Sequence, residues 1–217
     1  MAALHFMKVR AECGHLVLGA TGKTGSRVAQ RLADRGTSVR RAARNGANVH
    51  FDWSDPKTFE PALRGVSGIW FMQNFSESFL KPVNDEIAVP CGTGAEAFVS
   101  AEDIASVAVA TLSSPARHAG RAYAPTGPDA LTFEEAARLI SIAVGRKITY
   151  RDIDRNAWIN AMIKAGVPAE YGEVLRSLTE TVASGHGSRP NGDVLMAIGA
   201  APTRFEEFAV KTVSAWR

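Results

Sequence analysis

A glycine-rich turn between an apolar run and a helical pattern limits the fold of this chain more than any other feature. The run His15–Leu18 has the apolar character of a buried parallel strand, and Thr24–Arg35 carries Val28 and Leu32 on one helical face. The segment 19–25 lies between them. A dinucleotide-binding turn requires this order of strand, glycine turn and helix. The sequence therefore predicts a dinucleotide-binding βα unit near its start.

The turn reads G-x-x-G-x-x-G, a variant of the common G-x-G-x-x-G pattern. Glycine permits a tight turn with positive φ and a close approach of the backbone to a pyrophosphate, while the helix start offers N–H groups. The alternative is a glycine turn that binds no ligand, and Lys23-Thr24 lacks the preceding frame of a Walker loop. We expect cofactor contacts from six residues of the turn: Gly19, Thr21, Gly22, Lys23, Thr24 and Gly25.

The end of the expected second strand indicates which nicotinamide cofactor binds. An NAD site places a carboxylate about 20 residues after the turn, where it binds the ribose 2′-hydroxyl. Residues 40–45 instead contain Arg40, Arg41 and Arg44 and no carboxylate. Arginine binds a 2′-phosphate through two N–H groups. Because Arg40 and Arg41 alternate faces of a strand, Arg44 is the predicted phosphate ligand, Lys23 can add a second charge, and NADP(H) should be preferred over NAD(H).

Asp52 and Trp53 follow the expected third strand, 48–51, at the position where the adenine should lie. A carboxylate accepts a hydrogen bond from the adenine amino group, and an indole ring offers a flat wall to the base. The alternative assigns Asp52 to the cap of the next helix and Trp53 to the core. Both interpretations are open on the sequence alone.

Alternating element signals predict the fold class. Segments 38–43 and 66–71 read as further strands, and a helix after Ser54-Asp55-Pro56 separates the third strand from the fourth. We expect an α/β fold, a doubly wound Rossmann parallel sheet with a smaller, mostly helical C-terminal substrate lobe. The expected division is a leader at 1–12, an NAD(P)-binding part at 13–70 and a substrate-side part at 71–217.

Helix-start signals dominate the second half of the chain. Capping patterns stand at Ser100–Asp103, Thr132–Glu135 and Thr203–Glu206. Asp154 and Pro168 are start signals for two more helices, and Gly145 is placed to end the helix that begins near Thr132.

Composition and charge exclude several classes of protein. The chain has 217 residues, of which 46% are hydrophobic, so it is neither disordered nor collagen-like. Its net charge of +3 is spread without long single-sign blocks, which argues against a nucleic-acid partner. Two distant cysteines predict a reducing, cytoplasmic compartment. The histidines lack the spacing of metal ligands, and no apolar stretch is long enough to cross a bilayer, so no metal and no membrane partner are expected.

Five blocks of the sequence resemble the NmrA-like, atypical short-chain dehydrogenases, in particular the branch that includes the fungal festuclavine and agroclavine dehydrogenases. They are L-V-L-G-A-T-G-K-T-G at 16–25, F-D-W at 51–53, W-F-M-Q-N-F-S-E at 70–77, F-V-S-A-E-D-I-A at 98–105 and G-R-K-I-T at 145–149. The glycine motif occurs in many enzymes, whereas the 70–77 block is much more specific. The resemblance extends over nearly the whole chain and implies NAD(P)H binding and hydride transfer.

The resemblance also exposes two departures. In the family, further strand–helix–strand material separates the fourth strand from the W-F-M-x-N-F block, but here the two abut near 69–71. A βα unit takes about 30 residues, so roughly 60 to 90 residues appear missing and the intact polypeptide should be longer. In addition, none of the three tyrosines has a lysine four residues later, so the acid dyad of ordinary short-chain dehydrogenases is absent and no catalytic residue is assigned.

The resemblance places residues 70–75 in the crevice beyond the carboxyl ends of the strands, where substrates bind in open α/β sheets. Flat apolar walls and an amide suit a substrate pocket, which gives Trp70, Phe71, Asn74 and Phe75 as substrate residues. Aromatic residues that simply fill the core are the alternative. With this resemblance, the expected function is NAD(P)H-dependent reduction of a small-molecule substrate, an apolar imine, quinone or enone. A non-catalytic, NmrA-like regulator that senses NADP is the second possibility.

Overall fold

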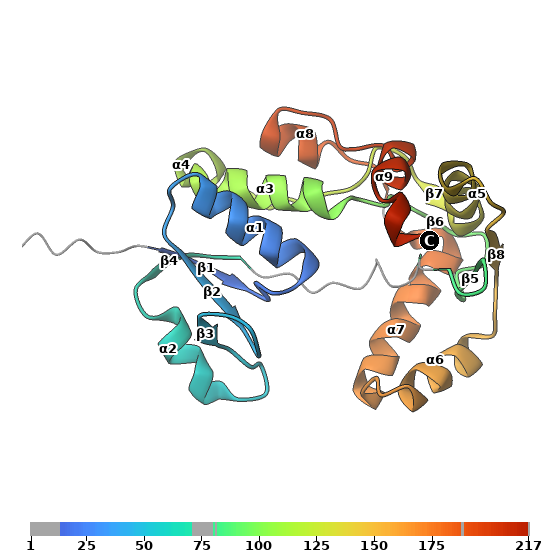
Figure 1. The fold of residues 1–217 in the computed structure, drawn as a ribbon, viewed down its shortest axis with the longest axis horizontal. Coiled ribbons are helices and arrows are strands. Elements are labelled where there is room, and N and C mark those ends of the chain that lie inside the picture. Colours follow the sequence, from blue (N-terminus) through green and yellow to red (C-terminus); the bar gives the residue numbers. More distant parts are fainter. Residues whose placement is uncertain (1–13, 71–79, 81, 188, 217) are drawn as a thin grey trace, which may run out of the picture. The chain divides into compact units, whose positions relative to one another are not determined.

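A computed structural model describes residues 14–70, 80, 82–187 and 189–216, without the side chains of Trp70 and Glu170 (Figure 1). The expected leader, 1–12, lies outside the described residues. The chain divides into two compact units. Of the described residues, 14–70 and 105–120 form the first unit, and 80, 82–104 and 121–216 form the second. The expected boundary at 70/71 stays a proposal, and residues 105–120 return to the first unit.

The first unit is built on a four-stranded parallel sheet of order β3-β2-β1-β4. Its strands are β1 (Gly14–Leu18), β2 (Val39–Ala43), β3 (Val49–His50) and β4 (Val66–Trp70). Successive side chains of a strand point to opposite faces, and Leu16, Val17 and Leu18 are all buried. Both faces of β1 are therefore covered, which explains why its sequence is a continuous apolar run rather than an alternating one.

Helices cover the two faces of this sheet (Figure 1). The described helices of the first unit are α1 (Lys23–Asp34), α2 (Phe59–Leu63) after the 3₁₀ turn Pro56–Thr58, the 105–113 part of α3 (Ala101–Ser113), and α4 (Pro115–His118). Val17 packs with Val28 and Leu32 of α1 and Val109 of α3, whereas Leu16 packs on the opposite face in a cluster that includes Ala62 of α2. This arrangement is the doubly wound sheet that the sequence predicts.

The β4 strand forms one edge of the described sheet. Within the residues that the structure describes, β4 pairs only with β1, and no strand follows on its other side. The chain after Trp70 passes into residues outside the description, which is where the sequence predicts a missing internal segment. That expectation therefore stays a prediction.

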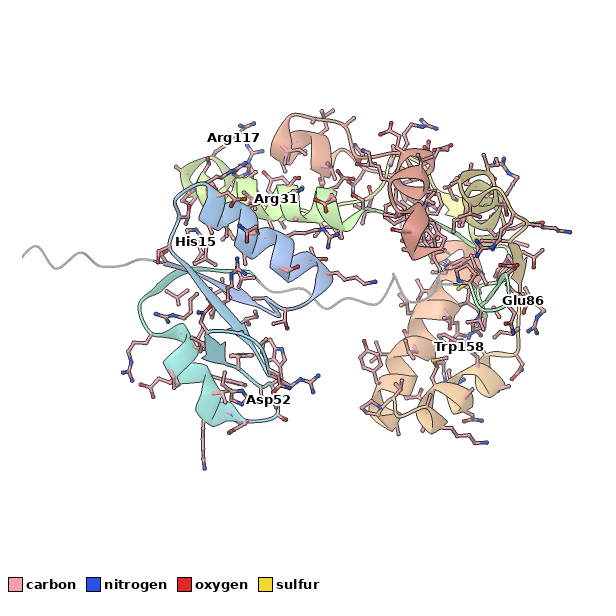
Figure 2. The ribbon with its side chains drawn as sticks, in the orientation of Figure 1. His15, Arg31, Asp52, Glu86, Arg117 and Trp158 are labelled. Atoms are coloured by element: carbon pink, nitrogen blue, oxygen red, sulfur yellow. The ribbon has the colours of Figure 1, made fainter. Side chains whose placement is uncertain are left out.

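The second unit is mostly helical, as expected. It contains a parallel pair, β5 (Glu86–Ala88) with β8 (Thr149–Arg151), and an antiparallel pair, β6 (Ala95–Glu96) with β7 (Leu131–Thr132). Its helices are α5 (Phe133–Val144), α6 (Arg155–Lys164), α7 (Ala169–Thr181), the π-helical turn Val182–His186, α8 (Asp193–Ile198), α9 (Phe205–Lys211) and the 3₁₀ turn Val213–Ala215. One core joins them, with Ile87, Ile140 and Leu175 among its buried side chains. Trp158, labelled in Figure 2, belongs to the same core.

Two of the three predicted capping patterns are confirmed and one is wrong. The Thr132 hydroxyl accepts from the Glu135 N–H at 3.1 Å, and the Glu135 carboxylate accepts from the Thr132 N–H at 2.8 Å. Ser100 and Asp103 make the corresponding contact at the start of α3. Thr203, in contrast, does not cap α9, whose N-cap residue is Arg204 and has no side-chain cap. The Thr203 hydroxyl and N–H instead donate to the Asp103 carboxylate at 3.1 and 2.9 Å.

We expect Asp103→Ala to lower the free energy of unfolding by about 2 to 4 kcal/mol, because three donors lose a buried, charged acceptor. The Asp103 side chain is buried and accepts from Ser100 Oγ at 2.7 Å as well as from both donors of Thr203. Urea unfolding measures the loss. Glu134→Ala removes an exposed carboxylate from the first turn of α5 and is the matched control. Equal losses in the two variants would contradict this role for Asp103.

Candidate functional site

The glycine turn links β1 to α1 through close backbone contacts. Gly19 has a φ of 65°, in the left-handed region that glycine adopts without strain, and its carbonyl accepts from the Gly22 N–H at 2.8 Å. The Ala20 N–H donates to the Ala42 carbonyl at 3.1 Å, which ties the turn to β2. A Cβ on Gly25 would lie 2.2 Å from the Gly19 carbonyl oxygen. The first turn of α1 can approach the end of β1 only because residue 25 is glycine.

The start of α1 suits an anion. Gly22 is the N-cap residue and supplies no side-chain acceptor to the first helical N–H groups. The first turn also contains no acidic residue that would offset the positive end of the helix dipole. A helix start with N–H groups available and a glycine cradle in front of it is the usual binding site for a pyrophosphate. The residues present therefore fit a dinucleotide.

Thr24 can serve such a ligand only through its backbone. Its side chain is 2% exposed, and its hydroxyl has no hydrogen-bond partner within the described part of the chain. A buried hydroxyl without a partner costs stability. The predicted contact from Thr24 thus reduces to its N–H group in the first turn of α1.

Thr24→Val is expected to raise the free energy of unfolding of the cofactor-free protein by about 1 kcal/mol, because valine keeps the shape and removes the unpaired hydroxyl. Affinity for NADPH should stay within a few-fold of wild type, since the backbone is unchanged. Thermal unfolding and an NADPH titration check the two parts. A destabilised variant would show that the hydroxyl has a partner after all.

The three arginines after the turn have different surroundings. Arg40 donates from Nη1 to the carbonyls of Ala62 and Arg64 at 2.7 Å, and so holds the end of α2 against the sheet. Arg41 donates to Gln30 Oε1 of α1 at 3.1 Å. Arg44 lies just beyond the end of β2 and is exposed. Both strand arginines are therefore engaged in packing the fold, and Arg44 is the one exposed at the strand end.

The loop that carries Arg44 lies against the glycine turn. A Cβ on Gly46 would be 3.5 Å from Thr21 Cγ2, and Gly46 has a φ of 71°. The Arg44 carbonyl is also fixed, 2.9 Å from His50 Nδ1. The loop 44–48 contains no carboxylate. A dinucleotide bound at the turn would thus meet a positive side chain and no negative one from this loop.

Asp52 lies beyond the end of β3 (Figure 2), and Trp53 follows it in the chain. The Asp52 carboxylate accepts from the N–H and the hydroxyl of Ser54 at 2.9 and 2.7 Å, and these hydrogen bonds lower the pKa of Asp52, with smaller contributions from the charges of Arg44 and His50. Asp55, not Asp52, caps the following helical turn. The helix-cap alternative for Asp52 is therefore wrong.

The core alternative for Trp53 is also wrong. The Trp53 side chain is 65% exposed and makes edge contacts with Phe51 and Phe59, with ring centroids 4.8 and 5.9 Å away. An exposed indole next to the carboxyl end of β3 is compatible with a base-binding wall. Contact of Asp52 and Trp53 with adenine stays a prediction.

The predicted substrate residues fall mostly outside the described residues. Phe71, Asn74 and Phe75 are among those that the structure does not describe, as is the side chain of Trp70. The Trp70 backbone ends β4 and pairs in register with Val17 of β1. Because β1 and β4 are parallel, the predicted substrate segment begins at the carboxyl ends of the strands, where the glycine turn also begins.

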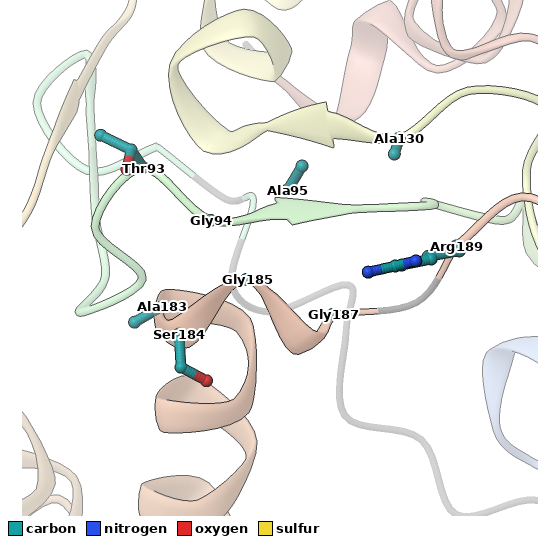
Figure 3. Close-up of a pocket in the computed structure, with 9 residues that line it drawn as sticks. All are labelled: Thr93, Gly94, Ala95, Ala130, Ala183, Ser184, Gly185, Gly187 and Arg189. Atoms are coloured by element: carbon teal, nitrogen blue, oxygen red, sulfur yellow. The ribbon is translucent and has the colours of Figure 1, made fainter.

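A pocket in the second unit was not found by sequence reasoning (Figure 3). Glycines at 185 and 187 are its only local signal, and they are typical of an ordinary loop.

Among the described residues no group of three or more His, Cys, Asp or Glu side chains could hold a metal ion. No helix in the described ranges is long and apolar enough to cross a membrane.

Comparison with known sequences identifies several relatives. YesF, an uncharacterized oxidoreductase of Bacillus subtilis (strain 168), is 26% identical over 274 alignment positions, which cover 93% of this chain and 96% of YesF. Festuclavine synthase II of Penicillium roqueforti (strain FM164) is 30% identical over 152 residues, 68% of this chain and 52% of the relative. NAD(P)H azoreductase of Xenophilus azovorans is 31% identical over 142 residues, 64% of this chain and 49% of the relative. No family model matches the chain.

The alignments differ in their extent. The chain spans about half the length of festuclavine synthase II and of the azoreductase. The YesF alignment, with 274 positions, is longer than the 217 residues of this chain, so part of YesF has no counterpart here.

Solved structures share the fold at low sequence identity. Triphenylmethane reductase of Citrobacter sp. superposes with a TM-score of 0.68 at 18% identity, over 92% of this chain and 99% of that one. An NADPH-dependent quinone oxidoreductase of Escherichia coli superposes with a TM-score of 0.67 at 16% identity, over 92% of this chain and 98% of that one. A mutant NmrA superposes with a TM-score of 0.60 at 14% identity, over 94% of this chain and 96% of that one. The chain therefore shares the Rossmann-like fold of these reductases and of NmrA, and its sequence relatives include proteins named as oxidoreductases and festuclavine synthases.

Proposed function

We propose that the protein is an oxidoreductase that uses NADP(H), in preference to NAD(H), to reduce an apolar imine, quinone or enone. The observation that carries the proposal is the turn 19–25, in which Gly25 packs against the Gly19 carbonyl and an uncapped helix start follows. Relatives named as NAD(P)H azoreductase and festuclavine synthase, and structural neighbours named as NADPH-dependent reductases, support it.

Each part of the proposed cofactor site has a definite role. The N–H groups at the start of α1 bind the pyrophosphate, and Arg44 pairs with the 2′-phosphate. Asp52 and Trp53 receive the adenine. When bound, the cofactor supplies the hydride. These residues orient it, and the substrate segment that begins at Trp70 holds the acceptor and excludes water.

None of the three tyrosines of this sequence belongs to a Tyr-x-x-x-Lys dyad, and the proposal names acceptors that react without one. An imine carbon or a quinone is already electrophilic, so hydride can arrive without a strong protein acid. A simple ketone, in contrast, needs proton donation to its oxygen as the hydride arrives. The proposal therefore names activated acceptors as the substrates. A cytoplasmic location, as expected from the sequence, belongs to the same proposal.

Calorimetric titration of the protein with NADPH and with NADH tests the site. We expect saturable binding of both nucleotides, with NADPH the tighter ligand. Heat changes no larger than those of dilution with either nucleotide would overturn the proposal.

A further inference from the structure

The pocket of the second unit has a volume of about 500 Å³, within the size range of small-molecule sites (Figure 3). It lies between β6 and the π-helical turn that follows α7. Of its lining residues only one is charged, and most of the others are alanine or glycine: Thr93, Gly94, Ala95, Ala130, Ala183, Ser184, Gly185, Gly187 and Arg189.

Backbone contacts at two glycines fix the walls of this pocket. A Cβ on Gly94 would lie 1.8 Å from the Val182 carbonyl oxygen, and a Cβ on Gly187 would lie 2.3 Å from the Ala95 carbonyl oxygen. The strand and the turn therefore meet at both ends without intervening side chains. Gly185, with a φ of 79°, reverses the chain between these two contacts. The space is set by the backbone and does not depend on flexible side chains.

The single charged lining residue points into this space. Figure 3 shows the Arg189 side chain directed between β6 and the turn, toward Gly185 and Gly187. Within the described part of the chain, Arg189 makes no hydrogen bond and no ion pair. Glu96 is the carboxylate close by, with an oxygen that would be 2.8 Å from a Cβ on Gly187, but no salt bridge joins it to Arg189.

A guanidinium aimed into a pocket recognises a planar anion best. It presents parallel N–H donors that match the two oxygens of a carboxylate. The methyl groups of Ala95 and Ala130 and the bare backbone of the glycines leave room for a flat apolar body beside that charge. We propose that this pocket binds a small, flat organic carboxylate through Arg189. This site is additional to the proposed cofactor site, and binding there does not require hydride transfer.

Titration with 1-naphthoate and with 1-naphthamide tests the proposal, because the two probes share their shape and differ in charge. We expect the whole protein to bind 1-naphthoate at least about tenfold more tightly than 1-naphthamide. Arg189→Gln should weaken 1-naphthoate roughly tenfold or more and leave 1-naphthamide within a few-fold. Arg138→Gln, which removes an exposed arginine of α5 outside the pocket, is the matched control and should bind both probes as wild type does.

A second variant tests the location independently of charge. Ala130 is exposed and lines the pocket, so Ala130→Leu should fill space without disturbing the core and should weaken both probes. Equal 1-naphthoate affinity in wild type and Arg189→Gln would overturn the proposal, as would equal losses in Arg189→Gln and Arg138→Gln, or unchanged binding in Ala130→Leu. Absence of 1-naphthoate binding to wild type would overturn it as well.

An NADPH titration separates this proposal from the proposed function. Arg189→Gln should bind NADPH as wild type does, because the glycine turn belongs to the other unit. A protein that binds NADPH but not 1-naphthoate would overturn only the carboxylate site. One that binds 1-naphthoate but not NADPH would overturn only the proposed function.

Discussion

Gly25→Ala is expected to weaken NADPH binding by at least about tenfold and to lower the free energy of unfolding by about 2 to 3 kcal/mol. In an ordinary helix the change from glycine to alanine stabilises the protein by up to about 1 kcal/mol. At Gly25 we expect the opposite, a loss of stability. The reason is steric: the new methyl group would lie 2.2 Å from the Gly19 carbonyl oxygen and 2.8 Å from its carbon. Both are backbone atoms, so either the turn or the helix start must move.

Gly192→Ala is the control for this substitution. A Cβ at Gly192 meets nothing within 4 Å, and the residue has a φ of −91°, so alanine fits without strain. Urea unfolding and NADPH titration of both variants give the comparison. If Gly25→Ala is as stable as Gly192→Ala and keeps its NADPH affinity, the close approach of α1 to the turn is not required.

Arg44→Ala is expected to weaken NADPH binding by about 1.5 to 3 kcal/mol, roughly 10- to 150-fold, and to leave NADH affinity nearly unchanged. Only the 2′-phosphate distinguishes the two nucleotides, and an exposed arginine next to the glycine turn is the residue placed to bind it. The variant should therefore lose its preference for NADPH.

Arg41→Ala removes an equal charge from the same strand region and is the matched control. The Arg41 side chain donates a hydrogen bond to Gln30 of α1, so it is not the arginine expected to bind the 2′-phosphate. It should bind both nucleotides as wild type does, apart from a small general effect of charge. If wild type binds NADH as tightly as NADPH and Arg44→Ala weakens neither nucleotide, the assignment of Arg44 is wrong.

Local signals in the sequence were sufficient for the nucleotide-binding half of the fold. The continuous apolar run of β1, the glycine turn and the spacing of Val28 and Leu32 each depend on residues within a few positions of one another. The capping pattern at Thr132 is local in the same way. Such features can be predicted from the sequence because they depend on neighbouring residues and need no contact with a distant part of the chain.

Features that depend on distant partners were missed. Thr203 looks like a helix cap until Asp103, far away in the sequence, accepts both of its donors. Local patterns also left two interpretations of Trp53 open, and its exposure depends on how Phe51 and Phe59 pack. The pocket around Arg189 requires the strand at Gly94 to meet the turn at Val182, a contact between segments nearly ninety residues apart.

Following NADPH absorbance tests whether this chain uses NADPH to reduce an activated small molecule. Wild-type protein is incubated with NADPH and a panel of quinones, cyclic imines and enones, and Gly25→Ala, which should bind NADPH weakly, is the control. We expect steady, enzyme-dependent consumption of NADPH with at least one class of acceptor, faster than with NADH, and a large loss of rate in Gly25→Ala. Tight NADPH binding without consumption across the whole panel would contradict it and would indicate a cofactor-sensing protein.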